Sequence, residues 1–158
     1  MINIYMAKRR LLMNKSNPFL ELKNKSVFVD TSAWFALLNK KEQEHAKIKE
    51  IYQALLENNN TLIISNQVLG ETFTLLRYRI KNNEPPFKFI ELINKSMMIK
   101  KVFVEEKFEK EALKILKDYQ DQKFSYVDAT SFAVMNGLEL KYALSLDTHF
   151  AAAGFIIP

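Results

Sequence analysis

Cysteine is absent from the 158 residues of this chain. Its absence excludes disulfides, thiolate catalysis and cysteine-based zinc or iron–sulfur sites. Long apolar runs are also missing, and none approaches the roughly 20 residues that a membrane-spanning helix needs. The N-terminus has no continuous apolar segment followed by a small-residue cleavage site. We therefore expect one cytoplasmic domain that makes no contact with a membrane.

The net charge of +5 is unevenly distributed along the chain. Residues 1–26 contain six basic side chains and one acidic side chain, whereas residues 27–158 contain 17 of each sign. The overall basicity is therefore weak evidence that the domain binds nucleic acid. We interpret residues 1–24 as a basic N-terminal appendage and residues 25–158 as the domain. A short amphipathic helix, a docked tail and an upstream start codon all remain open as explanations of the appendage.

Short apolar runs alternate with amphipathic segments after the appendage. This alternation predicts an α/β fold with a mostly parallel sheet covered by helices on both faces. Proline cannot continue a helix, so a break is expected at 82–86, and Gly137 is expected to stop a helix. The predicted strands are 26–30, 61–64, 102–104 and 143–146. The predicted helices are 33–38, 43–57, a segment from Ser65 or Asn66 to 81, then 87–95, 105–119, 126–136 and a short turn at 149–153.

Four acidic residues stand where such a fold brings strand ends and helix starts together: Asp30, Glu71, Asp128 and Asp147. Asp30 and Asp147 end apolar runs, and ligands of open parallel sheets collect at the carboxyl ends of the strands. If these two strands are neighbours at the centre of the sheet, all four carboxylates can face one pocket. Carboxylates so placed repel one another without a cation, and hard divalent ions prefer oxygen ligands. The pattern predicts a metal site.

Each acid also has a structural interpretation. Asp30 and Asp147 could each be helix N-caps, worth about 1 kcal/mol. Asp128 lies three residues after Ser125, which is the spacing of a capping box. Glu71 could be an ordinary exposed helix residue, although the neighbouring Gly70 costs a helix roughly 1 kcal/mol. A glycine there suggests that backbone or a ligand approaches closely.

Four stretches of the chain together resemble PIN-domain ribonucleases, particularly the VapC-like toxins of type II toxin–antitoxin systems. Each stretch alone is weak, but the four occur in family order, and the resemblance runs from Val27 to Pro158. The stretches are Val29-Asp30-Thr31-Ser32-Ala33-Trp34, Leu69-Gly70-Glu71-Thr72-Phe73-Thr74-Leu75-Leu76-Arg77, residues 124–135 around Asp128, and Leu144-Ser145-Leu146-Asp147-Thr148-His149-Phe150.

The resemblance implies a three-layer α/β/α PIN-like fold with a mostly parallel central sheet. It implies a metal-dependent endoribonuclease in which Asp30, Glu71, Asp128 and Asp147 bind one or two Mg²⁺ or Mn²⁺ ions, with no nucleophilic side chain. It makes the position of His149 structural, with a ligand or base role as the alternative. Thr31, Ser32 and Ser145 could orient the carboxylates. Arg77, Arg79 and Lys81 could contact RNA phosphates, or could simply favour the helix dipole.

The implied partners are an RNA substrate, a second copy of the chain in a homodimer, and a small antitoxin that blocks the acidic pocket. Two other interpretations stay open: an RNA-processing or quality-control PIN nuclease, and a non-catalytic PIN-fold module that binds RNA or protein. A phospho-aspartate phosphatase of the haloacid-dehalogenase type is set aside. That chemistry needs a second acid two residues after Asp30, where this chain has Ser32.

Overall fold

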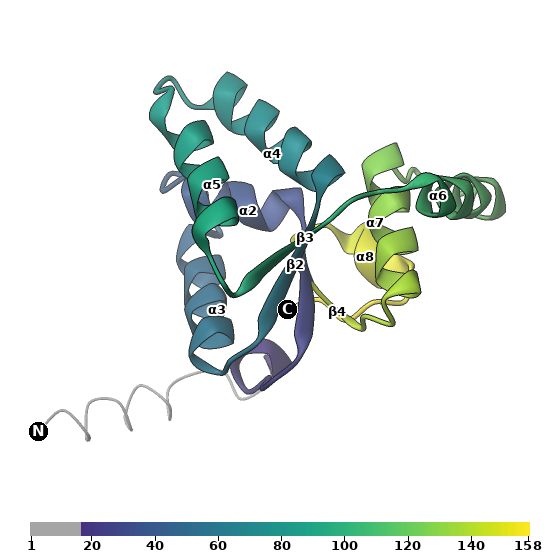
Figure 1. The fold of residues 1–158 in the computed structure, drawn as a ribbon, viewed down its shortest axis with the longest axis horizontal. Coiled ribbons are helices and arrows are strands. Elements are labelled where there is room, and N and C mark those ends of the chain that lie inside the picture. Colours follow the sequence, from purple (N-terminus) through teal and green to yellow (C-terminus); the bar gives the residue numbers. More distant parts are fainter. Residues whose placement is uncertain (1–16) are drawn as a thin grey trace, which may run out of the picture.

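A four-stranded, entirely parallel sheet forms the centre of the protein (Figure 1). We describe it from a computed structural model that covers residues 17–158. The strand order is β3-β2-β1-β4, so β1 lies inside the sheet between β2 and β4. The predicted pairing of the first and fourth strands is confirmed, but β4 is an edge strand. The strands are β1 (Ser26–Val29), β2 (Thr61–Ser65), β3 (Ile99–Val102) and β4 (Tyr142–Leu144).

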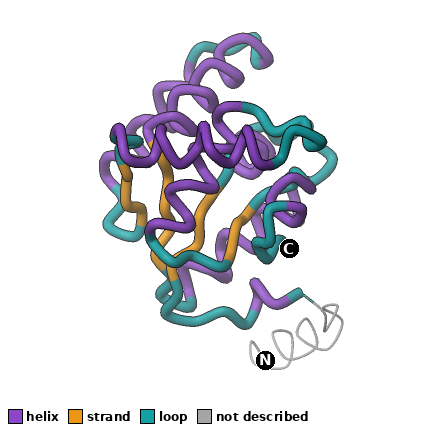
Figure 2. Tube along the Cα trace, turned by 90° about the vertical axis from the view of Figure 1, so that its right-hand side faces the viewer, coloured by secondary structure: helices purple, strands orange, loops and turns teal. Residues whose placement is uncertain are grey.

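Helices cover both faces of the sheet, which confirms the predicted three-layer α/β/α arrangement. Figure 1 shows α3 and α5 on one side and α7 and α8 on the other, with α6 lying beyond α7. The view in Figure 2 shows the strands side by side among the helices. The helices are η1 (Pro18–Leu20), α2 (Thr31–Leu38), α3 (His45–Glu57), α4 (Asn66–Arg79), α5 (Glu84–Lys95), α6 (Glu106–Asp118), α7 (Tyr126–Gly137) and α8 (Thr148–Ala152).

The hydrophobic core occupies both helix–sheet interfaces. The strands β1 and β2 are buried along almost their whole length, as expected for interior strands of a parallel sheet. Trp34 is fully buried and packs against Phe89, with ring centroids 5.4 Å apart. On the opposite side Phe132 packs edge-on against Phe150 at 5.0 Å. Aromatic rings therefore fill the space under the helices, and none of these four is available to stack on a base.

Two predicted segments, the third strand and the break after α4, lie elsewhere than expected. The third strand was expected at 102–104 but runs from Ile99 to Val102, because its exposed residues Lys100 and Lys101 hid the pattern. Charged residues of this kind are typical of sheet edges. The expected break at 82–86 lies earlier, at 80–83, and residues 84–86 form the first turn of α5, where proline lacks only an N–H that would have no partner within the helix.

Gly137 ends α7 as predicted, but for a different reason. The left-handed residue that follows this helix is Glu139, with φ 55°. A Cβ atom on Gly137 would lie 2.7 Å from Cε1 of Phe108. The glycine is therefore needed for the close packing of α6 on α7.

Residues 17–24 pack on the amino end of the sheet. Phe19 is fully buried and lies edge-on to Tyr142 at 5.9 Å. The buried side chain of Asn60 donates to the carbonyl of Leu22 at 2.7 Å. The predicted boundary between residues 24 and 25 stays a prediction. A chain that begins at residue 25 would lose these contacts, and residues 1–16 lie outside the described part.

No helix within residues 17–158 is long and apolar enough to cross a bilayer.

Candidate functional site

Asp30 and Asp147 leave the same edge of the sheet. Val29, the last residue of β1, pairs with Leu144, the last residue of β4, and the Asp30 N–H donates to the Leu144 carbonyl at 3.0 Å. Both acids are also helix N-caps, of α2 and α8 respectively. The capping and site interpretations of these two residues are therefore compatible. Each of the two carboxylates caps a helix and also lies at the carboxyl edge of the sheet.

Asp30 is held in place by two serines. Its Oδ2 accepts hydrogen bonds from the Ser32 hydroxyl at 2.7 Å, from the Ser32 N–H at 3.2 Å and from the Ser145 hydroxyl at 3.1 Å. The Ser145 hydroxyl also accepts the Asp147 N–H at 3.0 Å, which ties the second acid to the same network. Ser32 and Ser145 therefore occupy the orienting positions that the sequence suggested for them.

Burial raises the pKa of Asp30 above its ordinary value, although the hydrogen bonds from Ser32 and Ser145 act in the opposite direction. Only 6% of the residue is exposed. A carboxylate in this environment is stabilised by a nearby cation, since its own contacts do not offset the loss of water.

Glu71 reaches the same edge from α4. It lies in the second turn of that helix, and its Oε2 accepts a hydrogen bond from the buried Thr31 hydroxyl at 2.6 Å. This bond connects the acid of α4 to the first turn of α2. Unlike the other three acids, Glu71 caps no helix, so it has no evident role in starting an element.

Asp128 and Asp147 meet at His149. Asp128 closes the capping box of α7, as its spacing from Ser125 predicted, and its Oδ2 lies 3.3 Å from the His149 Nδ1. The Asp147 Oδ2 lies 3.4 Å from the same nitrogen. The Asp128 side chain is 13% exposed and that of Asp147 37%. This part of the site is therefore more open than the surroundings of Asp30.

All four predicted acids line one cleft of about 400 Å³. Sequence reasoning kept a ligand or base role for His149 only as the alternative, and it missed Lys123. His149 was given a structural position, yet it faces two of the acids. Lys123 lies in the loop before α7, and only its closeness to the capping box could have indicated it. The cleft is lined by Asp30, Thr31, Ser32, Glu71, Leu75, Lys123, Ser125, Asp128, Asp147 and His149.

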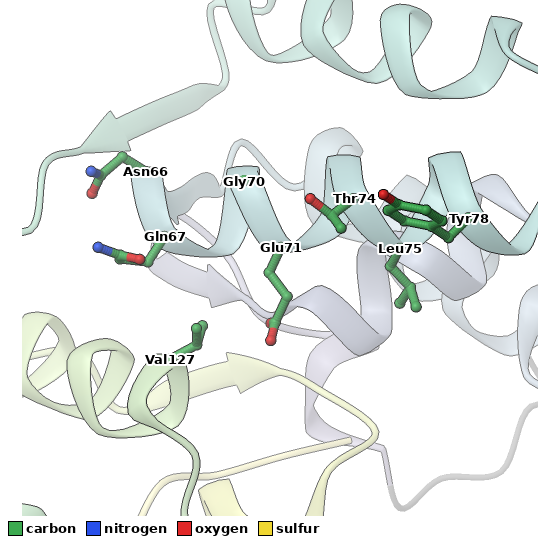
Figure 3. Close-up of a pocket in the computed structure, with 8 residues that line it drawn as sticks. All are labelled: Asn66, Gln67, Gly70, Glu71, Thr74, Leu75, Tyr78 and Val127. Atoms are coloured by element: carbon green, nitrogen blue, oxygen red, sulfur yellow. The ribbon is translucent and has the colours of Figure 1, made fainter.

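A second hollow of about 450 Å³ runs along α4 beside the cleft (Figure 3). Glu71 and Leu75 line both hollows, so the two are adjacent. Gly70 lies in its wall, and a Cβ atom added there would meet nothing within 4 Å. The expectation that backbone approaches Gly70 closely is therefore wrong. The open space leaves room for a ligand. Near the end of the hollow, Tyr78 is 83% exposed.

Arg77, Arg79 and Lys81 are exposed at and just beyond the end of α4. None of them lines the acidic cleft. Within residues 17–158 they form no salt bridge with an acidic side chain. Their predicted contact with RNA phosphates stays a prediction.

The donors of the cleft fit a divalent cation. One ligand atom each of Asp128, Asp147 and His149 lies within 4.8 Å of the others, the only such group of three within residues 17–158. Carboxylate oxygens suit Mg²⁺ and Mn²⁺, and imidazole nitrogen suits transition metals. Asp30 and Glu71 line the same cleft outside this group. Whether they also bind the ion stays a prediction.

Comparison with known proteins places this geometry in a family. The PIN domain family matches residues 27–156. The 23S rRNA-specific endonuclease VapC20 of Mycobacterium tuberculosis is 35% identical over 130 residues, which cover 82% of this chain and 95% of the relative. A VapC ribonuclease of Archaeoglobus fulgidus is 30% identical over 128 residues, 80% of each chain.

Solved structures agree with these sequence matches. The crystal structure of the Mycobacterium tuberculosis VapC20, described as a sarcin-ricin loop cleaving toxin, has a TM-score of 0.75 and covers 82% of this chain and 96% of its own. The VapBC2 structure from Rickettsia felis has a TM-score of 0.61 at 15% identity, covers 84% of this chain and 97% of its own, and shows the fold alone. The chain belongs to the PIN-domain family, in which its curated relatives are VapC-type ribonucleases.

Proposed function

We propose that this protein is a metal-dependent endoribonuclease that hydrolyses RNA phosphodiester bonds in the cleft lined by Asp30, Glu71, Asp128 and Asp147. The observation that carries the proposal is the convergence of four carboxylates, from four separate segments, on one cleft. A scaffold without activity would not need all four. The cofactor is Mg²⁺ or Mn²⁺, since both favour oxygen ligands at such sites.

The divalent cation, when bound, makes a water molecule more acidic and stabilises the charge that develops on the phosphate. The chain's own residues orient the cleft for this reaction. Ser32 and Ser145 fix the Asp30 carboxylate, and Thr31 fixes Glu71. Lys123 lies at the cleft, where its ammonium group is suited to an RNA phosphate.

The hollow along α4 gives the RNA strand a path into the cleft. It adjoins the cleft at Glu71 and Leu75, which line both hollows. Arg77 and Arg79, in the last turn of the same helix, and Lys81 beyond it would contact the RNA backbone. Ribosomal RNA is the first candidate substrate, because the Mycobacterium tuberculosis relative is named as a 23S rRNA-specific endonuclease.

The biological role that fits these relatives is that of the toxin in a toxin–antitoxin pair, acting in the cytoplasm as a homodimer. The partner would be a small antitoxin that places a basic side chain in the acidic cleft. A short neighbouring reading frame for a DNA-binding protein would support this role over RNA processing. Its absence would favour the processing nuclease.

Cleavage of a structured RNA by the purified full chain tests the activity. We expect cleavage with Mn²⁺ or Mg²⁺ and none in EDTA. Glu71→Gln is the matched inactive variant: Glu71 caps no helix, and a glutamine oxygen can still accept the Thr31 hydrogen bond. Cleavage that persists in EDTA, or equal cleavage by Glu71→Gln purified in the same way, would reject the proposal.

A further inference from the structure

His149 stands between two of the acids in a position suited to bind the cation itself. We propose that its Nδ1 is a metal ligand alongside Asp128 and Asp147, and that this nitrogen makes the site prefer Mn²⁺ to Mg²⁺. The inference rests on the proposed function, because it concerns the same cleft. It adds a nitrogen donor to a site otherwise described by carboxylates.

The distances around His149 Nδ1 are those of neighbouring ligands. Its separations from Asp128 Oδ2 and Asp147 Oδ2 are 3.3 and 3.4 Å. Donors on an ion with bonds of about 2.1 Å lie about 3.0 Å apart in octahedral geometry and about 3.4 Å apart in tetrahedral geometry. The two separations from Nδ1 therefore match those of donors that share an ion, and the ligand atoms of the three residues all lie within 4.8 Å of one another.

The same distances are poor for hydrogen bonds. A charge-assisted N–H to carboxylate bond is usually about 2.7–2.9 Å long. Nδ1 makes neither contact at that length, although both oxygens face it. If Nδ1 carries no proton, three electron-rich atoms converge on one point, and only a cation there makes the arrangement favourable.

Local structure holds the three donors in this arrangement. The Asp147 Oδ1 accepts the His149 N–H at 2.8 Å, so its other oxygen, Oδ2, is the one that faces the ring. The Asp128 Oδ2 accepts the Ser125 N–H at 2.8 Å. The imidazole lies edge-on to the buried Phe124, with centroids 5.3 Å apart. Because helix caps and an aromatic contact orient the donors, the site is formed before any ion arrives.

A nitrogen ligand changes which metal the site favours. Mg²⁺ takes oxygen ligands almost exclusively, whereas imidazole suits transition metals, and Mn²⁺ accepts both. We therefore expect the ratio of Mg²⁺ to Mn²⁺ dissociation constants to be larger in the wild type than in His149→Asp, by roughly tenfold or more.

Pulsed electron paramagnetic resonance of the Mn²⁺-loaded full chain tests the ligand directly. The chain has only two histidines, so labelling with ¹⁵N-histidine marks His45 and His149 alone. His45→Gln is the matched control. The His45 Nδ1 lies 2.8 Å from the Ala36 carbonyl, and the residue does not line the cleft.

We expect ¹⁵N modulation of the Mn²⁺ signal in the wild type and in His45→Gln. It should be lost in His149→Asp, and titrations with MnCl₂ and MgCl₂ should show the reduced preference. If wild-type protein binds Mn²⁺ without nitrogen modulation, the inference is overturned while the proposed nuclease survives. Modulation that His149→Asp retains would overturn it too. If no Mn²⁺ binds but Mg²⁺ does, the inference is overturned and the nuclease survives. If neither ion binds, both proposals fail together, and EDTA-resistant cleavage would separately identify a failure of the nuclease mechanism.

Discussion

The two ends of the central sheet both bury polar side chains, but in opposite ways. At the amino end the fully buried Asn60 forms three hydrogen bonds. Its amide nitrogen donates to the carbonyls of Leu22 and Leu55, and its oxygen accepts the Lys25 N–H. At the carboxyl end Asp30 is almost as buried, yet it is an ionisable carboxyl group near three further acids, and burial raises its pKa. A neutral group with all its partners inside the chain serves the fold. A charged group without a cationic partner indicates a ligand.

Replacing the amide of Asn60 by a carboxylate, as in Asn60→Asp, should have the largest effect on stability. Asn60→Asp would place a carboxylate against two carbonyl oxygens that now receive hydrogen bonds. A buried, uncompensated charge costs about 3–5 kcal/mol. We expect a fall of that size in the free energy of unfolding, measured by urea denaturation. If the variant does not fold, Asn60→Ala should still show a clear loss. An unchanged midpoint in Asn60→Ala would mean that this end does not depend on the amide.

The reverse exchange at the carboxyl end should have the opposite sign. Asp30→Asn removes a buried charge while keeping an oxygen that can accept bonds from Ser32 and Ser145. Because burial raises the pKa of Asp30, its contribution to stability is greatest below the unfolded pKa and is lost as the pH rises through the folded one. At neutral pH without metal, we expect the variant to melt at or above the wild-type temperature, with RNA cleavage reduced by orders of magnitude. A lower melting temperature with normal cleavage would show that Asp30 serves the fold alone.

Asp128 combines the two kinds of polar group, because it caps α7 and also faces His149. In Asp128→Asn the amide oxygen can still accept the Ser125 N–H, so the loss of capping should cost no more than about 1 kcal/mol. We expect a nearly unchanged melting temperature without metal, a smaller stabilisation by Mn²⁺ and greatly reduced cleavage. Melts of wild type and variant, with and without Mn²⁺, measure this. A less stable variant with a full Mn²⁺ shift would remove Asp128 from the metal site.

The substitution Gly70→Ala should have the smallest effect on stability. Nothing lies within 4 Å of a Cβ atom added there, so Gly70→Ala should stabilise α4 by about 0.5–1 kcal/mol. If RNA passes along this helix, cleavage should fall although the protein becomes more stable. Thermal melts and initial cleavage rates on the same RNA separate the two effects. More stable protein with unchanged cleavage would show that the strand takes another path.

The sequence predicted the layers of the fold and the four acids of the cleft because both follow from local patterns. A parallel sheet produces alternating apolar runs and amphipathic segments, and strand ends bring Asp30 and Asp147 together. The contacts that sequence missed depend on distant residues. Nothing local indicates that Phe19 packs on Tyr142, or that His149 reaches Asp128, 21 positions earlier. The third strand was misplaced because an edge strand with exposed lysines lacks the apolar run of an interior one.

The double role of three acids as helix caps has a consequence for how this protein could evolve. Asp30 and Asp147 are the N-caps of α2 and α8, and Asp128 completes the capping box of α7, whereas Glu71 has no capping contact. A descendant under selection for binding alone could replace Asp30 or Asp147 by serine, threonine or asparagine and keep those helix starts, and it could keep the capping box of α7 with glutamate or glutamine in place of Asp128. Glu71 would be under no such restriction and would be free to change first. Among descendants of this chain, the residue aligned with Glu71 should therefore be the most sensitive record of whether catalysis was retained.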